Sequence, residues 1–413
     1  MKNVLLIAYF YPPLSGAGAV RPAEFSRYLP LYGWRTQVLT VMNDVDYPRD
    51  QSLWSVIPAD QRICRAYRLP VFTILKRLAR GALRSQTLLY SFLDPQYDWV
   101  PAAIALGKRM LRTERFDAIL ASAPPYSALR VARALREFSG LPAVADIRDP
   151  FTANELAVFP TRFHRSFYRI YERRLLANMD HILIASARYF SDIRDAVGLR
   201  SVPITHVPNG YDPEEFEGTE VSPPTERFVL GYIGSIYGPL SPLPFFRAVR
   251  GALDKQPLLA EYLRMRFVGR MDKTAVLRSA RATGVEDFVE VLGFRPHVEA
   301  VQLTKSCHAL VTFGGMVSKS IPAKVYEYAA AGRMTISFEK PGMLSGFMSN
   351  NGLGWDIDGD DPTQGADIIL SLFTKFISGE PLPSPAKANR IRFSRRELAG
   401  KVAQVLDSVC RDD

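Results

Sequence analysis

Two glycines, Gly16 and Gly18, lie where the first apolar segment of the chain gives way to a helical pattern. A turn without side chains lets the backbone approach a ligand closely, and the free N–H groups that open a helix attract anions. Arg21, one helical turn further on, would add a fixed positive charge at the same point. A turn that merely requires positive φ explains the glycines equally well, because the third glycine of a dinucleotide-binding turn is missing.

Two carboxylates, Asp146 and Asp149, end a second apolar segment. In open α/β sheets ligands bind beyond the carboxyl ends of the strands, and a carboxylate there can accept a proton from an attacking hydroxyl group. We therefore predict that Asp149, Asp146 and Arg21 are the catalytic residues. The alternative is an arginine–aspartate ion pair that stabilises a loop.

A glycine-bearing loop with Lys319 and Ser320 leads into a helical segment that carries Lys324 and Glu327. A helix start attracts phosphate, and a glutamate just over one turn into the helix can accept hydrogen bonds from ribose hydroxyls. These residues are candidates for binding a nucleoside diphosphate. A solvated glutamate on an ordinary helix is the alternative for Glu327.

Two acidic clusters imitate metal sites, at residues 44–46 and 356–361. The second resembles the start of a calcium loop, but the glycine at its sixth place and the closing glutamate are missing. We expect both clusters to be solvated loops, and we predict neither a metal ion nor another cofactor.

A basic and apolar mixture extends over residues 62–84. Its cations are Arg62, Arg65, Arg68, Lys76, Arg77, Arg80 and Arg84. Such a segment suits peripheral contact with an anionic membrane, where each cation contributes about 1 kcal/mol. A helix packed on its own sheet with a solvated basic face is an equally good interpretation.

Strands that alternate with helical patterns are expected throughout the chain. The first half has apolar segments at 4–10, 36–41, 118–121, 143–147, 181–186 and 205–207, and the second half at 228–233, 265–269, 288–292, 309–313 and 334–338. This alternation predicts two doubly wound parallel sheets in tandem.

The two expected domains cover residues 1–211 and 226–394, with an acidic, proline-rich linker at 212–225. A helix at 395–409 has one apolar face and is expected to pack back on the first domain. Gly234 and Ser235 follow the first strand of the second domain, as Gly16 follows the first strand of the chain.

Composition is that of an ordinary globular protein, with 413 residues, 47% hydrophobic and 23% charged. Three scattered cysteines suggest neither a disulfide framework nor a metal site, and no apolar segment has the ~18 residues that span a bilayer. We expect a cytoplasmic protein, peripheral at the inner face of the plasma membrane. The net charge of +10 fits anionic partners, although the absence of a long basic tail argues against nucleic acid.

Several of these segments together resemble the retaining glycosyltransferases of family 4. The matching residues are Tyr9 to Pro13 with Gly16, Gly18 and Arg21, then 146–151, 208–210 and 322–332. The resemblance implies the GT-B architecture, in which two Rossmann-like domains face an interdomain cleft. It also implies an acceptor bound on the N-terminal side and a nucleotide-sugar on the C-terminal side.

By this resemblance, Glu327 matches the second glutamate of the family's paired-glutamate motif, which usually binds the donor ribose. Two positions depart from the family pattern. Lys319 stands where the first glutamate is expected, and Gly234 and Ser235 lie in a segment that often supplies an arginine and a lysine. Lys319, Lys324 or Arg270 would then neutralise the leaving diphosphate. The donor-binding set is Gly16, Gly18, Gly234, Ser235, Arg270, Lys319, Ser320, Lys324 and Glu327.

The expected function is metal-independent, retaining transfer of a hexose-type sugar from a nucleotide-sugar donor to a glycan or lipid-linked acceptor in cell-surface polysaccharide biosynthesis. Two alternatives keep the same architecture. One is a nucleotide-sugar epimerase, and the other is a catalytically weak nucleotide-sugar-binding or scaffold protein, suggested by Ser235 and Lys319.

Overall fold

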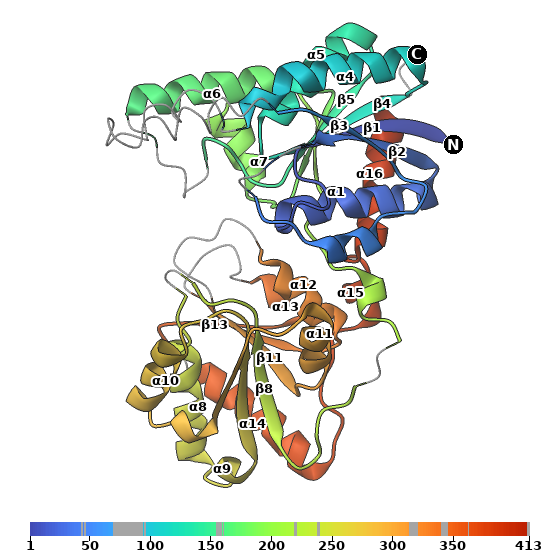
Figure 1. Ribbon diagram of the computed structural model, residues 1–413. Helices are drawn as coiled ribbons and strands as arrows, with labels where there is room; N and C mark the ends of the chain where they lie inside the picture. The colour runs from blue at the N-terminus through green and yellow to red at the C-terminus, as the bar shows by residue number, and fades with distance from the viewer. Residues whose placement is uncertain are drawn as a thin grey trace. The chain divides into compact units, whose positions relative to one another are not determined.

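The chain is divided into two compact units in the computed structural model (Figure 1). The structure describes residues 1–42, 44, 47–68, 94, 96–153, 159, 161–218, 221–237, 240–313, 321–339, 346–361 and 363–410. Unit 1 comprises Met1–Pro208 and Leu398–Asp413, and unit 2 comprises Asn209–Glu397.

Unit 1 is built on a seven-stranded sheet with the order β3-β2-β1-β4-β5-β6-β7. All its pairings are parallel. The strands are β1 (Lys2–Ala8), β2 (Trp34–Val41), β3 (Arg62–Ala66), β4 (Ala118–Ala123), β5 (Ala143–Ile147), β6 (His181–Ile184) and β7 (Ile204–His206). The strand order reverses beside β1, so this is the doubly wound parallel sheet that the sequence predicted.

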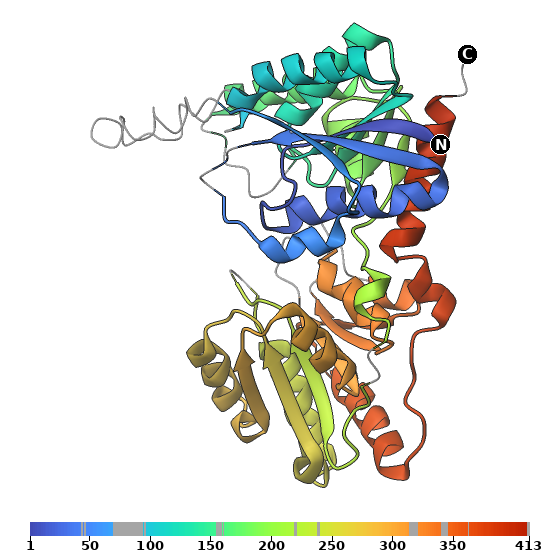
Figure 2. The same ribbon diagram turned by 45° about the vertical axis from the view of Figure 1, so that its right-hand side comes forward.

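Helices cover both faces of this sheet because alternate side chains of each strand point to opposite sides. On one face, Val4 and Leu6 of β1 pack with α1 (Ala17–Tyr28) and with α16 (Arg395–Val409) from Leu398 onward. On the other face, Leu5 and Ile7 pack in a core with α4 (Val100–Thr113), α5 (Ser127–Ser139) and α6 (Arg162–Leu176). Figure 2 shows α16 running beside the sheet of unit 1.

Unit 2 has a six-stranded parallel sheet with the order β10-β9-β8-β11-β12-β13. Its strands are β8 (Phe228–Ile233), β9 (Leu263–Val268), β10 (Val289–Gly293), β11 (Ala309–Phe313), β12 (Thr335–Glu339) and β13 (Gly354–Asp358). Its helices are α8 (Leu243–Lys255), α9 (Leu259–Tyr262), α10 (Lys273–Ala282), α11 (His297–Lys305), α12 (Ala323–Ala330), α13 (Phe347–Asn350), α14 (Thr363–Ser378) and α15 (Lys387–Ile391). Two Rossmann-like sheets therefore confirm the expected fold class.

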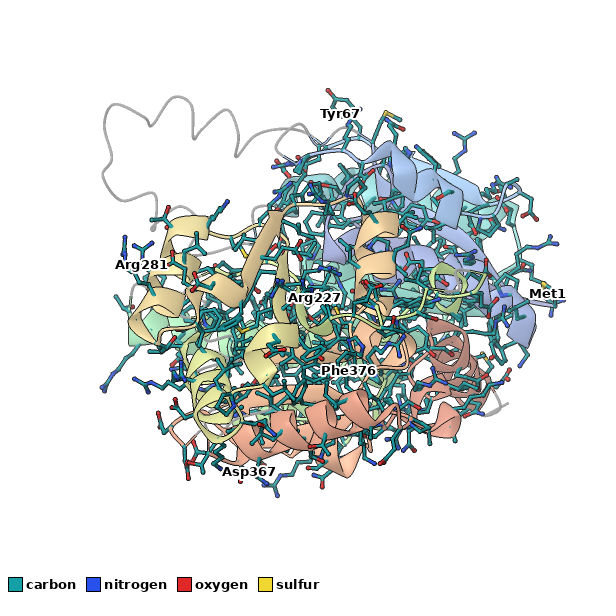
Figure 3. The ribbon with its side chains drawn as sticks, turned by 90° about the horizontal axis from the view of Figure 1, so that it is seen from below. Met1, Tyr67, Arg227, Arg281, Asp367 and Phe376 are labelled. Atoms are coloured by element: carbon teal, nitrogen blue, oxygen red, sulfur yellow. The ribbon has the colours of Figure 1, made fainter. Side chains whose placement is uncertain are left out.

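The core of unit 2 lies mainly between the sheet and α8, α10 and α14. Phe376 of α14 packs against Phe228 of β8 at a ring-centroid distance of 5.5 Å. Figure 3 shows Arg281 and Asp367 toward the periphery, and these residues pair with Glu286 and Lys255. Among the described residues, no helix combines the length and the apolar character that crossing a membrane requires.

The segment expected as a linker, 212–225, is part of unit 2 as far as it is described. Tyr211 donates its backbone N–H to Phe393 O at 3.1 Å, and its carbonyl accepts from Arg395 N at 2.8 Å. The Tyr211 and Phe216 side chains join an apolar cluster that includes Tyr326 of α12. The unit boundary therefore falls before Asn209, ahead of the expected boundary after residue 211.

Asp44 and Asp356 differ from the solvated loops that we expected for the two acidic clusters, whereas Asp358, Asp360 and Asp361 are exposed. Asp44 is buried, and its carboxylate accepts from Tyr9 Oη at 2.5 Å and pairs with Arg68 at 3.2 Å. Asp356 lies in β13 and accepts hydrogen bonds from the N–H groups of Met348 and Ser349 at 3.2 and 2.9 Å. Within the described ranges, no group of three or more His, Cys, Asp or Glu side chains is placed to bind a metal ion.

Candidate functional site

Arg21 and Asp146 form a buried, fully hydrogen-bonded ion pair in unit 1. Nε and Nη2 of Arg21 donate to Asp146 Oδ1 at 3.0 and 2.8 Å, and Ser122 Oγ donates to Asp146 Oδ2 at 2.9 Å. The guanidinium also donates to the carbonyls of Val207 and Pro208 at 2.9 and 2.8 Å. Asp146 is completely buried, so this arrangement favours the structural ion pair over a catalytic role for these two residues.

Asp149 is the exposed carboxylate at the carboxyl end of β5. Tyr189 of α7 (Tyr189–Ser191) donates to its Oδ1 at 3.3 Å, and Tyr126 donates to its backbone carbonyl at 3.2 Å. Of the carboxylates predicted to be catalytic, Asp149 is therefore the one that can contact a ligand.

The loop after Asp149 is held by Glu172 of α6, which the sequence analysis missed. The buried Glu172 carboxylate accepts from the N–H groups of Phe151 and Thr152 at 3.1 Å each. It also accepts from the Tyr126 hydroxyl at 3.2 Å. Burial raises the pKa of Glu172, while these hydrogen bonds oppose the shift. A single glutamate among the buried residues of a helix was the signal that could have found it.

Both glycines at the start of α1 have a structural reason. Gly16, the N-cap residue, adopts φ 101°. A Cβ at Gly18 would lie 2.7 Å from Arg148 Nη1, so a larger residue here would displace the guanidinium from the first turn of the helix. Burial lowers the pKa of Arg148 to about 10, and Nη2 donates to the Pro124 carbonyl. Arg148, absent from our predicted site, thus adds a cation beside the glycine turn.

In unit 2, Gly234 and Gly269 bring the carboxyl ends of β8 and β9 into close contact. Gly269 has φ +132°, and a Cβ there would lie 2.3 Å from Gly234 O. Gly234 N donates to Val268 O at 2.7 Å, and Ile236 N donates to Arg270 O at 2.9 Å. The backbone contact leaves Ser235 and Arg270 exposed at this edge of the sheet.

Arg270 lies with its guanidinium 5.2 Å from the ring centroid of Phe294, which follows β10 and is 63% exposed. The Ser235 carbonyl accepts from Tyr232 Oη at 3.0 Å. Arg270, Phe294 and Ser235 thus present one cation, one aromatic ring and one hydroxyl at the carboxyl ends of the adjacent strands β9, β10 and β8. Ligands of open α/β proteins bind at this end of the strands.

Lys324 lies in the first turn of α12 against the aromatic side chains of two strands. Its Nζ donates to Tyr232 Oη at 2.6 Å and is 4.0 Å from the centroid of the same ring, which stacks on Phe313. Burial lowers the pKa of Lys324 to about 7, although Glu339 and Glu327 oppose the shift. An anion bound here would restore the full positive charge.

Glu327, one turn after Lys324 on α12, is partly buried. Burial raises the pKa of its carboxyl, and the charges of His297 and Arg395 oppose the shift. His297, at the start of α11, pairs with Glu215 at 3.0 Å, and that carboxylate raises the pKa of His297. Glu339 at the end of β12 is also buried, which raises its pKa to about 7. None of the four neighbours, His297, Arg395, Glu215 and Glu339, was predicted as a site residue from the sequence.

Lys319 and Ser320 lie outside the described residues, as do residues 69–84 of the basic stretch. In its described part, Arg62–Ala66 forms the edge strand β3 and not the helix that we considered. Arg65 donates to the carbonyls of Val41 and Pro12, and Arg68 is buried beside Asp44 and Asp98.

Known proteins match this chain both in a sequence family and in fold. The model of Glycosyltransferase Family 4 matches residues 23–215. HepE from Anabaena, solved in complex with UDP, has 16% identity and a TM-score of 0.60, covering 99% of this chain and 100% of that one. A glycosyltransferase from Rickettsia africae has 12% identity and a TM-score of 0.65, covering 100% and 99%. The apo lipopolysaccharide outer core galactosyltransferase WaaB has 15% identity and a TM-score of 0.59, covering 98% and 99%. No curated protein sequence matches the chain.

These similarities confirm the resemblance to glycosyltransferase family 4 that the sequence motifs indicated. The match to the family model covers residues 23–215, and the whole chain shares the fold of these glycosyltransferase structures.

Proposed function

We propose that the protein transfers a sugar from a nucleotide-sugar donor, with retention of anomeric configuration and without a metal ion, to a glycan or lipid-linked acceptor. Cell-surface polysaccharide biosynthesis is the expected setting, at the inner face of the plasma membrane. HepE has been crystallised with UDP-glucose, and WaaB carries the name of a lipopolysaccharide galactosyltransferase, and both support this choice.

The observation that supports it best is the pair Lys324 and Glu327 on successive turns at the start of α12. The desolvated ammonium group of Lys324 is suited to the leaving diphosphate, because a buried cation stabilises developing negative charge more strongly than a solvated one. Glu327 is suited to the ribose hydroxyls. In the described part of unit 2, the proposed donor-binding residues also include Ser235, Arg270 and the turn at Gly234. Lys319 and Ser320 are proposed to bind the donor as well.

Asp149 is the proposed general base of unit 1. The bond between the anomeric carbon of the donor and its phosphate oxygen breaks, and the acceptor hydroxyl oxygen forms its bond on the same face of that carbon, as retention requires. The proton of that hydroxyl passes to the Asp149 carboxylate, while the nucleoside diphosphate leaves with the bonding electron pair. Gly16, Gly18 and Arg148 would present backbone N–H groups and one cation to an anionic ligand, while Arg21 and Asp146 would position the surrounding loops.

A donor panel tests this proposal. Purified protein is incubated with nucleotide-sugars of different base and sugar, and free nucleoside diphosphate is measured with and without acceptor glycans. Glu327→Gln should lower turnover by about 10- to 100-fold, since a charge-assisted hydrogen bond to ribose contributes roughly 1.5–3 kcal/mol. Glu261→Gln is the matched control and should leave turnover unchanged. Glu261 lies on α9, directly before β9, and therefore at the amino ends of the strands, away from the proposed donor site.

The outcome also separates the alternatives. Isomerised donor sugar in the absence of acceptor, seen by NMR, would replace transfer by epimerisation. A donor that binds by calorimetry but is never turned over would identify a binding or scaffold protein. Failure of every nucleotide-sugar to bind would refute the proposal.

A further inference from the structure

An aromatic pair lies at the carboxyl end of the unit 1 sheet. Phe10 follows β1, and Tyr47 lies on the segment between β2 and β3. Their ring centroids are 4.7 Å apart and the ring planes make an angle of 66°, an edge-to-face contact in which each ring orients the other. Tyr47 nevertheless remains 36% exposed. The pair therefore offers an ordered aromatic surface at the end of the sheet where ligands of open α/β proteins bind.

The same pair borders the glycine turn of α1. A Cβ at Gly18 would lie 3.2 Å from Phe10 Cδ2 and 2.7 Å from Arg148 Nη1, so the ring and the guanidinium approach the same point of the turn. Asp149, the proposed general base, directly follows Arg148 in the chain. In the sheet, β1 and β5 are separated only by β4, which puts the ends of these two strands roughly 10 Å apart. The aromatic pair and the proposed base thus belong to one region of unit 1.

Backbone hydrogen bonds hold the Tyr47 segment against the glycine turn. Ser15 N donates to Pro48 O at 3.0 Å, and Asp50 N donates to Pro13 O at 2.8 Å. These bonds join the residues directly before the turn to the residues directly after Tyr47. The backbone of the turn therefore sets the position of the tyrosine.

Buried polar groups hold Tyr47 from the protein interior. Gln96, which is 6% exposed, donates through Nε2 to the Tyr47 hydroxyl at 3.2 Å. Three residues before Tyr47, the buried Asp44 carboxylate accepts from the Tyr9 hydroxyl and pairs with Arg68. Isolated exposed aromatic residues are common, but ordering one at its ring, its hydroxyl and its backbone costs conformational entropy. A side chain that is held in this way is preorganised for a ligand.

We propose that Phe10 and Tyr47 form a platform on which a sugar ring of the acceptor stacks. A pyranose ring carries C–H groups on its faces and hydroxyl groups around its rim. The C–H face packs on an aromatic ring, whereas the hydroxyls need polar partners around it. The inference rests on the proposed function, because it takes Asp149 as the base that receives the proton of the acceptor hydroxyl. It assigns the carbohydrate part of the acceptor, and not a lipid part, to this region.

The surroundings of the pair favour a sugar over an acyl chain. Arg49 and Asp50 are exposed close to Tyr47 in the chain, and the Arg148 guanidinium approaches the glycine turn beside Phe10. An acyl chain would offer these charged groups no hydrogen bond, whereas sugar hydroxyls both donate and accept. A small aromatic surface bordered by charged groups matches the apolar face and polar rim of a pyranose.

Saturation-transfer difference NMR of the full chain tests the platform with the methyl pyranosides of glucose, galactose, mannose, rhamnose and N-acetylglucosamine. At least one glycoside should receive saturation, strongest on the protons of one ring face. Tyr47→Ala should weaken the binding of that glycoside about tenfold, because an aromatic contact is lost with the apolar area that it buries. Tyr47→Leu, which fills the space without a ring, carries the same expectation. Tyr47→Phe keeps the ring and should bind nearly as well as the unchanged protein.

Phe138→Ala is the matched control. Phe138 is 39% exposed, similar to Tyr47, but it lies one residue before the end of α5. This helix runs from the carboxyl end of β4 to the amino end of β5, so Phe138 is at the opposite end of the sheet. Its replacement should leave glycoside binding unchanged. Thermal unfolding of each variant shows whether a loss of binding comes from misfolding.

The proposal is overturned if no glycoside of the panel receives saturation, or if Tyr47→Ala and Tyr47→Leu both bind the glycoside like the unchanged protein. Uridine and adenosine complete the panel. Binding of a nucleoside in place of the glycosides, with the same dependence on Tyr47, would assign the platform to the donor base and would also overturn the proposal.

The assay contains no nucleotide-sugar, so its failure would leave the donor part of the proposed function standing. Conversely, failure of every nucleotide-sugar to bind would refute the transfer reaction without altering the glycoside result.

Discussion

The Arg21 guanidinium donates to Asp146 through Nε and Nη2, at a point where neither side chain is open to solvent. Replacing one partner would leave an uncompensated buried charge, which costs about 3–5 kcal/mol. We expect Asp146→Asn and Arg21→Met to lower the free energy of unfolding of unit 1 by that amount. Urea unfolding followed by tryptophan fluorescence measures this, because Trp34 and Trp99 are buried in unit 1.

The double variant Arg21→Met with Asp146→Leu provides the control. It removes both charges, so its loss of stability should be smaller than the sum of the two single losses. If Asp146→Asn retained full stability but lost all turnover, the interpretation as a structural ion pair would be wrong, and the catalytic role predicted from the sequence would stand.

Gly269→Ala should strongly destabilise unit 2. Its Cβ would lie 2.3 Å from Gly234 O, a backbone atom that cannot move without separating β8 from β9. We expect a loss of about 3 kcal/mol or more, because steric conflict adds to the strain of positive φ. Gly284→Ala is matched to it, since Gly284 also has positive φ, +66°, but has open space around its Cβ position.

For Gly284→Ala the loss should be about 1 kcal/mol, the cost of a left-handed conformation alone. Differential scanning calorimetry of the thermal unfolding transition compares the two variants. Equal losses would show that the contact between Gly269 and Gly234 has no energetic importance.

The central strands were predictable from the sequence, and two edge strands were not. Segments such as 228–233 and 309–313 are continuous apolar runs because both faces of a central parallel strand are covered. β3 and β13 lie at the edges of their sheets and are only partly buried, with arginines in β3 and two aspartates in β13. Their polar composition resembles that of a loop, and only pairing with β2 and β12 makes them strands.

Site residues could be predicted from the sequence where they directly follow a strand or lie at the start of a helix. Asp149, Lys324 and Glu327 were identified because they follow a strand or begin a helix. Glu172 and Glu339 were missed, since packing of distant segments brings them to the site. Arg148 precedes Asp149 in the chain, but only the fold brings its guanidinium beside Gly18. The sequence also could not distinguish Asp146 from Asp149, because burial depends on Arg21 being folded against the end of β5.

Glu172→Gln should loosen the loop that follows Asp149. An amide would place an NH₂ group against the N–H donors of Phe151 and Thr152, leaving one of them unsatisfied. We expect a loss of about 1–3 kcal/mol in stability. Acceptor KM should rise, while donor affinity measured by calorimetry stays the same. Glu137→Gln on α5 is the control, because Glu137 is exposed and pairs with Arg133 on the surface of the same helix.

Retained acceptor KM in Glu172→Gln, together with the expected loss of stability, would show that the loop position does not depend on Glu172. A matching loss in donor affinity would instead indicate that the substitution unfolds the protein generally. The two measurements therefore separate a positioning role from a merely structural one.

Lys324→Met should change how stability depends on pH. Burial lowers the pKa of Lys324 from 10.5 to about 7 in the folded protein. Between these values the unfolded chain binds a proton that the folded chain has released, so this group makes stability rise with pH from about 7 towards 10.5. Below pH 7 both states are protonated, and the cost of the buried charge is fully present.

Lys324→Met removes this charge, so the variant should be more stable than the unchanged protein at pH 7 and should lack the rise between about pH 7 and 9.5. Melting temperatures measured across this range test the expectation. Lys387→Met, at an exposed lysine of α15, should keep the rise. The variant should also bind donor more weakly, because the diphosphate loses its cation. A rise of unchanged slope in Lys324→Met would mean that the ammonium group is not desolvated by Tyr232 and Phe313.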